Sequence, residues 1–142
     1  MILIGIFGLL WLPAIALTIS QAVKPNFARS WIIAIAGAAL AWLGTFFLRL
    51  YLPMEVELIR WLPESLYHTV IAFRIDYINW HYMVAILALC IAVILTDSSR
   101  ASSNTSPTNW AAALALTGLN LVSVMARGPL TMAIAWAVTD LV

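Results

Sequence analysis

Polar residues in two apolar runs are the candidates for proton chemistry. Asp140 follows one run, and Thr117 and Asn120 stand three residues apart in another, with Ser123 three positions further on. In a helix this spacing places the Thr117, Asn120 and Ser123 side chains on roughly one face. Acids at membrane depth are costly and often functional, whereas small, hydrogen-bonding faces join membrane helices. Asp140, Asn120 and Thr117 are therefore proton-path candidates, and helix packing is the alternative for the polar face.

His81 and His68 carry ring nitrogens of the kind that bind a metal or a chlorin. Neither has a second ligand three or four residues later, so the sequence predicts no metal site. The neighbouring Trp80 is one of seven tryptophans, which suit lipid interfaces or contacts with a quinone, chlorin or carotenoid. His81 and Trp80 are accordingly candidate ligand contacts, and simple hydrogen bonding is the alternative.

Arg74 and Asp76 flank Ile75, and on a strand they would project to the same side. They either pair with each other, or Asp76 caps the following helix through the amides of Asn79 and Trp80. Both roles are structural. The sequence contains no nucleophile–base pair and no phosphate-binding loop. It therefore indicates no catalytic residue, and leaves open a non-catalytic place in an oxidoreductase or translocase complex.

The composition places the chain in a membrane. Of its 142 residues, 64% are hydrophobic and 9% are charged, against about a quarter charged in soluble domains. The net charge of +1 gives no indication of a nucleic-acid partner. A single cysteine, Cys90, excludes an internal disulfide. The first apolar run has no Lys or Arg before Lys24, so we expect a retained membrane helix rather than a signal peptide.

The predicted fold is all-α and polytopic, a single membrane domain over 1–142. Four apolar runs approach the roughly 20 residues that span a bilayer, and a partial fifth of about 20 Å does not. We expect Ser30 to cap the second helix, Ser106-Pro107 to start the fourth, and a strand or hairpin near 67–78 at the surface. The predicted helices cover residues 2–20, 30–51, 80–96, 109–125 and 130–142, with a surface segment at 52–79.

The run Phe73-Arg74-Ile75-Asp76-Tyr77-Ile78 before a membrane helix, followed by Ala135-Trp136 and Thr139-Asp140-Leu141, resembles the antiporter-like family. That family contains proton-translocating membrane subunits of respiratory complex I and Mrp-type cation/proton antiporters. The resemblance covers the N-terminal region of such subunits. It implies that Trp136 matches the family's Trp in the fifth helix. The glutamate that normally follows is Ala137 here, and Asp140 is its partial substitute.

This resemblance implies a small integral subunit of an energy-transducing complex that scaffolds rather than pumps alone. Its expected surroundings are other membrane subunits and lipid, in a bacterial inner membrane. The family's lysine and histidine relay corresponds to sequence beyond Val142. The alternative is a pigment- or quinone-associated accessory subunit of a photosynthetic or respiratory complex, motivated by the tryptophans and the two histidines.

Overall fold

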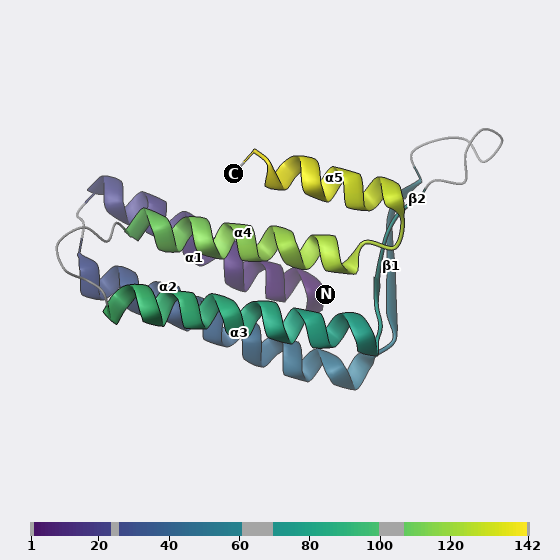
Figure 1. Cartoon of the computed structure of the whole chain (residues 1–142), viewed down its shortest axis with the longest axis horizontal. Coiled ribbons are helices and arrows are strands. Elements are labelled where there is room, and N and C mark those ends of the chain that lie inside the picture. The colour runs from purple at the N-terminus through teal and green to yellow at the C-terminus, as the bar shows by residue number, and fades with distance from the viewer. Residues whose placement is uncertain (1, 24–25, 61–69, 100–106, 142) are drawn as a thin grey trace.

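The computed structural model describes residues 2–23, 26–60, 70–99 and 107–141 (Figure 1). Apolar helices dominate this part of the chain, and a two-stranded sheet separates the second helix from the third. The elements are α1 (Ile2–Val23), α2 (Phe27–Leu48), the 3₁₀ turn η1 (Arg49–Tyr51), β1 (Met54–Arg60), β2 (Val70–Ile75), α3 (Tyr77–Ser99), α4 (Pro107–Met125) and α5 (Pro129–Thr139).

Helices α1 to α4 form one bundle, and α4 contacts each of the other helices. In Figure 1, α5 lies along the outside of α4 and ends about halfway down it. The bundle core is built from large apolar side chains with little or no exposure. They include Leu10, Leu17, Leu48, Met83, Leu87, Ile94, Trp110, Leu114, Leu121 and Met125.

Two glycines allow helix backbones to approach closely. A Cβ atom at Gly37 in α2 would lie 2.5 Å from Pro13 Cγ and 3.1 Å from the Leu9 carbonyl oxygen of α1. A Cβ at Gly118 in α4 would lie 2.8 Å from Trp11 Nε1. Membrane helices without a hydrophobic driving force associate through such small-residue contacts. Helix α1 therefore uses one glycine on each of two neighbouring helices.

The sheet lies across the end of the bundle where α2 ends and α3 begins (Figure 1). Strands β1 and β2 are antiparallel, with Met54 opposite Ile75 and a register irregularity between Glu57 and Ile59. The connection from α4 to α5 joins the same structure, because the Arg127 amide donates to the Ala72 carbonyl at 3.0 Å. One end of the bundle is thus tied together by backbone hydrogen bonds.

The ends of the elements differ from the sequence predictions. The predicted cap at Ser30 is wrong: α2 begins at Phe27, and Asn26 Oδ1 accepts the Arg29 amide at 3.2 Å. Ser30 is buried in a helical interior instead. Helix α3 continues to Ser99, past the predicted end at 96, and α4 begins at Pro107, as the Ser-Pro signal indicated. Ser106 itself lies outside the described residues.

Three of the described helical stretches are long and apolar enough to cross a membrane. They are Phe27–Tyr51, Tyr77–Ser99 and Thr108–Met125, while Gly8–Ser20 and Pro129–Thr139 are shorter apolar stretches. The 11 residues of α5 extend about 17 Å, against about 30 Å of hydrocarbon core. The fifth helix is therefore short, as the sequence predicted.

Candidate functional site

The polar side chains of α4 are bonded within their own helix or face outward. Thr117 Oγ1 donates to the Ala113 carbonyl at 2.6 Å, and Ser123 Oγ donates to the Leu119 carbonyl at 3.2 Å. Asn120 is exposed. Thr117 and Asn120 line a groove of about 280 Å³ whose other lining residues are Ile86, Leu89, Cys90, Val93 and Ala113. The Thr117 hydroxyl also has a side-chain hydrogen bond with Cys90 of α3. Within the described residues, no hydrogen bond links Thr117 to Asn120 or Ser123.

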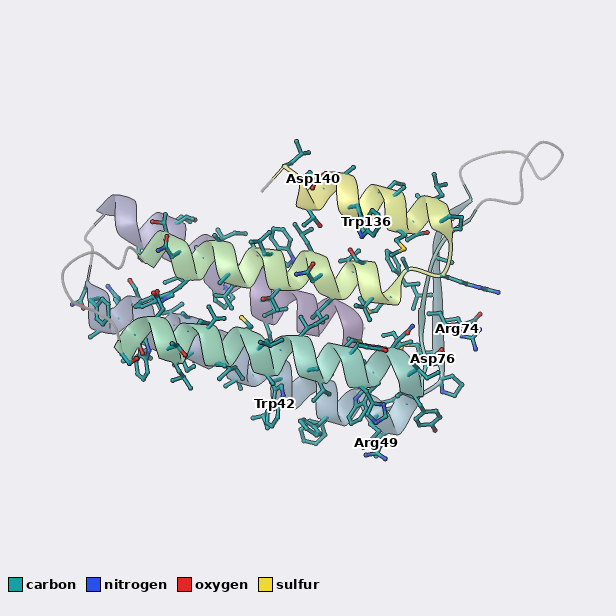
Figure 2. All side chains as sticks on the ribbon, in the orientation of Figure 1. Trp42, Arg49, Arg74, Asp76, Trp136 and Asp140 are labelled. Carbon is teal, nitrogen blue, oxygen red and sulfur yellow. The ribbon has the colours of Figure 1, made fainter. Side chains whose placement is uncertain are left out.

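Trp136 and Asp140 lie together on the outer helix. Trp136 is 58% exposed, and the Asp140 amide donates to the Trp136 carbonyl at 3.0 Å. Figure 2 shows Trp136 on α5 and Asp140 at the C-terminal end of that helix. Within the described residues, no hydrogen bond connects the Asp140 carboxylate to Thr117 or Asn120. The structure thus leaves the three proton-path candidates as two separate groups.

Four charged side chains form a cluster at the sheet end, here called the ion cluster: Glu55, Arg74, Asp76 and Arg127. Arg127 Nη1 lies 3.0 Å from Glu55 Oε2, and Arg74 Nε lies 3.6 Å from Glu55 Oε1 and 3.9 Å from Asp76 Oδ2. These side chains are one-third to one-half exposed, so each pair contributes about 0–1 kcal/mol. The ion cluster joins β1, β2 and the α4–α5 connection. Figure 2 shows Arg74 and Asp76 of this cluster at the sheet end.

Asp76 caps α3 as well as approaching Arg74. Its Oδ1 accepts the amides of Ile78 at 3.0 Å and Asn79 at 2.9 Å. The predicted bond to the Trp80 amide is wrong, because that N–H donates to the main-chain oxygen of Asp76. Both roles proposed for Asp76 from the sequence, the cap and the pair with Arg74, therefore coexist.

Trp80 connects α3 to the end of α2. Its indole Nε1 donates to the Thr45 carbonyl at 2.7 Å, and the residue is 4% exposed. The last carbonyls of an α-helix lack partners within the helix. Here the helix tightens into η1, and the Arg49 amide donates to the Phe46 carbonyl. The Thr45 carbonyl accepts the Trp80 indole N–H instead. The hydrogen-bonding capacity of Trp80 is thus used within the fold.

His81 stands beside Trp80 on the outside of the bundle. The two rings meet edge to face at 4.9 Å between centroids. His81 Nδ1 lies 2.5 Å from the Tyr77 carbonyl oxygen. Because a carbonyl only accepts, Nδ1 carries the proton, and Nε2 has its lone pair in the neutral ring. Within the described residues, no group of three His, Cys, Asp or Glu side chains has the geometry of a metal site. His68 lies outside those residues.

One polar contact at the other end of the bundle was missed from the sequence. Trp110 Nε1 donates to Asp97 Oδ2 at 2.8 Å, and Trp110 is 1% exposed, with Phe27 edge-on at 5.1 Å. The predicted helices cover 80–96 and 109–125, so Asp97 fell in the loop between them. Trp110 was interpreted, like the other tryptophans, as suited to a lipid interface. The available signal was an acid in the last turn of one helix and a tryptophan in the first turn of the next. This pair joins α3 to α4.

No family model and no curated protein matches this chain.

Proposed function

We propose that this chain is a small integral membrane subunit of a larger assembly, which it helps to hold together rather than conducting protons alone. In this proposal α1 to α4 cross the bilayer, and α5 enters it from the sheet end. Charged side chains of the three long apolar stretches support this arrangement, because Arg29, Arg49 and Asp97 lie near helix ends. At those positions they reach headgroups and water.

The observation that carries the proposal is the outward face of α5. Thr131 and Ala135 are the buried residues of this helix. Its large apolar side chains remain 39–58% exposed: Leu130, Met132, Ile134, Trp136 and Val138. A short helix held by two small residues offers an apolar surface on which another membrane helix packs. We expect the partner subunit to bind there.

The energy-transducing character of the assembly rests on the sequence motifs. The run from Phe73 to Ile78 leads into α3, Trp136 lies in α5 and Asp140 caps the C-terminus of α5, in the order of the antiporter-like subunits. Thr117 is bonded to its own helix and to Cys90, and Asn120 is exposed, which favours scaffolding over a proton path internal to this chain. A bacterial inner membrane with other membrane subunits is the proposed location.

Mild detergent extraction followed by mass spectrometry of the intact assembly tests this proposal. We expect the chain to travel with other membrane subunits, and Trp136→Ala to weaken that association. Leu12→Ala removes a similarly exposed side chain from α1 and is the matched control. Extraction as a stable monomer that conducts protons in proteoliposomes would overturn the proposal.

A second candidate function is a pigment- or quinone-associated accessory subunit, and the geometry of His81 favours it. Metal-binding histidines usually donate their second ring N–H to a carbonyl or carboxylate, which orients the ring. His81 has such a bond to Tyr77, and its side chain is exposed. Its Nε2 is therefore a suitable axial ligand for the magnesium of a chlorin.

The absorption spectrum of the assembly, purified from its native membrane, separates the two candidates. The absorption band of a chlorin bound through His81 would shift or disappear in His81→Ala. Loss of the band in His68→Ala instead would assign the ligand to His68. Absence of chlorin, carotenoid and quinone from the purified assembly would rule out the second candidate and leave the scaffolding role.

A further inference from the structure

We infer that Arg49, held on Trp80, binds the phosphate of an anionic phospholipid at the sheet end of α2 and α3. The inference rests on the proposed membrane location and is independent of the partner subunits. Figure 2 shows Arg49 at the end of α2, directed away from the bundle, on the same flank as Trp42. At that place the guanidinium would stand at the depth of the lipid headgroups.

Arg49 differs from Arg74 and Arg127, which lie at the same end of the bundle. Arg74 and Arg127 both face Glu55 in the ion cluster. In the described part of the chain, Arg49 forms no ion pair. Its guanidinium carbon lies over the Trp80 ring, 5.0 Å from the ring centroid. Its charge is therefore available to an anion from outside.

The guanidinium of Arg49 is positioned before any ligand arrives. It lies over Trp80, and the Trp80 ring is fixed by its bond to the Thr45 carbonyl and by Phe46, edge-on at 5.8 Å. A planar guanidinium offers paired N–H groups that match phosphate oxygens, and stacking leaves its edges free. Less side-chain freedom is then lost when the phosphate binds.

The surroundings of Arg49 fit a lipid better than a soluble anion. Phe47 is 67% exposed and Leu50 is 79% exposed, so apolar surface for acyl chains adjoins the cation. Tyr51 and Tyr77 are also exposed at this end, as residues of an interfacial aromatic belt are. A net-negative headgroup attracts the Arg49 guanidinium. In a zwitterionic headgroup, the positive group largely cancels the attraction of the phosphate. The site therefore favours phosphatidylglycerol-type lipids over phosphatidylcholine.

Native mass spectrometry of the full chain in detergent, titrated with phosphatidylglycerol or phosphatidylcholine, tests the site. We expect Arg49→Gln to lower phosphatidylglycerol affinity about fivefold, the effect of removing one basic group near a lipid surface. Arg29→Gln, an exposed arginine at the other end of α2, should leave it unchanged. Circular dichroism verifies that both variants are folded.

Three results would overturn the inference: equal phosphatidylglycerol affinity of Arg49→Gln and the unchanged protein, equal losses in both arginine variants, or displacement of the lipid by equimolar inorganic phosphate. The last result would assign the cation to a free anion. These outcomes differ from failure of the proposed function, in which alkaline carbonate would release the chain from native membranes. Failure of the lipid site alone would leave the chain embedded.

Discussion

Tryptophan side chains in α2 and α3 show how one residue type plays opposite energetic roles. Trp80 Nε1 has a buried acceptor in the Thr45 carbonyl, whereas the buried Nε1 atoms of Trp31 and Trp42 have no hydrogen-bond partner among the described residues. An unpaired buried polar group costs about 1–3 kcal/mol. The same substitution should therefore change stability differently at Trp80 and at Trp42.

Trp80→Phe should lower the free energy of unfolding by about 1–3 kcal/mol, because it leaves the Thr45 carbonyl without its donor. Trp42→Phe removes an unpaired donor and keeps a ring against Phe46, whose centroid lies 4.6 Å away. We expect its change to stay below about 1 kcal/mol. Unfolding in mixed detergent micelles gives both values. Equal losses would show that ring volume, not the hydrogen bond, determines the effect.

Gly37 is the position where one added methyl group should matter most. The Cβ of alanine would clash with the rigid ring of Pro13 and approach the Leu9 carbonyl, and neither can move independently. Gly37→Ala should destabilise the protein by about 1–3 kcal/mol, the usual cost of overpacking. At Gly8 the nearest atom is Leu12 Cδ1 at 3.9 Å, so Gly8→Ala should be neutral or stabilising. Thermal unfolding in detergent measures both, and an unchanged Gly37→Ala would mean that α1 moves away from α2 at little cost.

Two substitutions of Asp76, at the start of α3, distinguish the stability that its helix cap contributes from the stability that its charge contributes. Asp76→Ala removes the acceptor of the Ile78 and Asn79 amides and should cost about 1 kcal/mol. Asp76→Asn keeps a capping oxygen and loses the charge near Arg74, whose Nε lies 3.9 Å away. We expect the asparagine variant to retain most of the stability at every salt concentration. If both variants lose stability equally, and the loss disappears in high salt, the ion pair is the dominant contribution.

The α4–α5 connection depends on one acid, Glu55. Glu55→Gln should change global stability by less than about 1 kcal/mol, because the ion pairs are half exposed. It should nevertheless raise hydrogen exchange at the Arg127 amide, which donates to the Ala72 carbonyl beside the ion cluster. Asp97→Asn, at the opposite end, is the control. Unchanged exchange at Arg127 in Glu55→Gln would show that the backbone bridge holds without the ion cluster.

The helices were predictable from the sequence to a large extent, and their contacts were not. Apolar runs of suitable length marked each helix, and the cap at Asp76 was among the alternatives that the sequence offered, but the cap at Asn26 was not recognised. The strand or hairpin was expected near 67–78, where β2 lies, whereas β1 lies earlier in the predicted surface segment at 52–79. There Met54 and Val56 alternate with Glu55 and Glu57 as in a strand.

The site residues were recognised as types and not as neighbours. Trp80 and the Thr45 carbonyl are 35 residues apart, and Arg127 and Glu55 are 72 apart. Local periodicity carries no information about such pairs, which depend on how the helices pack and on where the sheet lies. The same limitation hid the contact between Asp97 and Trp110.

For the whole molecule, the proposed membrane arrangement places the two ends of the helix bundle on opposite sides of the membrane. Ser99 ends α3 and Leu50 follows α2, so the two lie at opposite ends of the bundle, and both are exposed. In a Cys90→Ala background, Ser99→Cys and Leu50→Cys should react with a membrane-impermeant maleimide from opposite sides of sealed vesicles. The cysteine-free parent is the control. Labelling of both positions from one side would contradict the crossing of α3.

The depth of α5 gives the sharpest test of the whole arrangement. The helix begins at the sheet end, and its 11 residues extend about 17 Å, roughly half of the hydrocarbon core. Val138, 40% exposed near its far end, should then lie in lipid or against a partner. We expect Val138→Cys to resist the maleimide from both sides and to react after the membrane is dissolved and partners are removed. Reaction in intact vesicles would place α5 on the membrane surface. The outward face of α5 would then contact headgroups instead of another helix, and the scaffolding proposal would lose its main support.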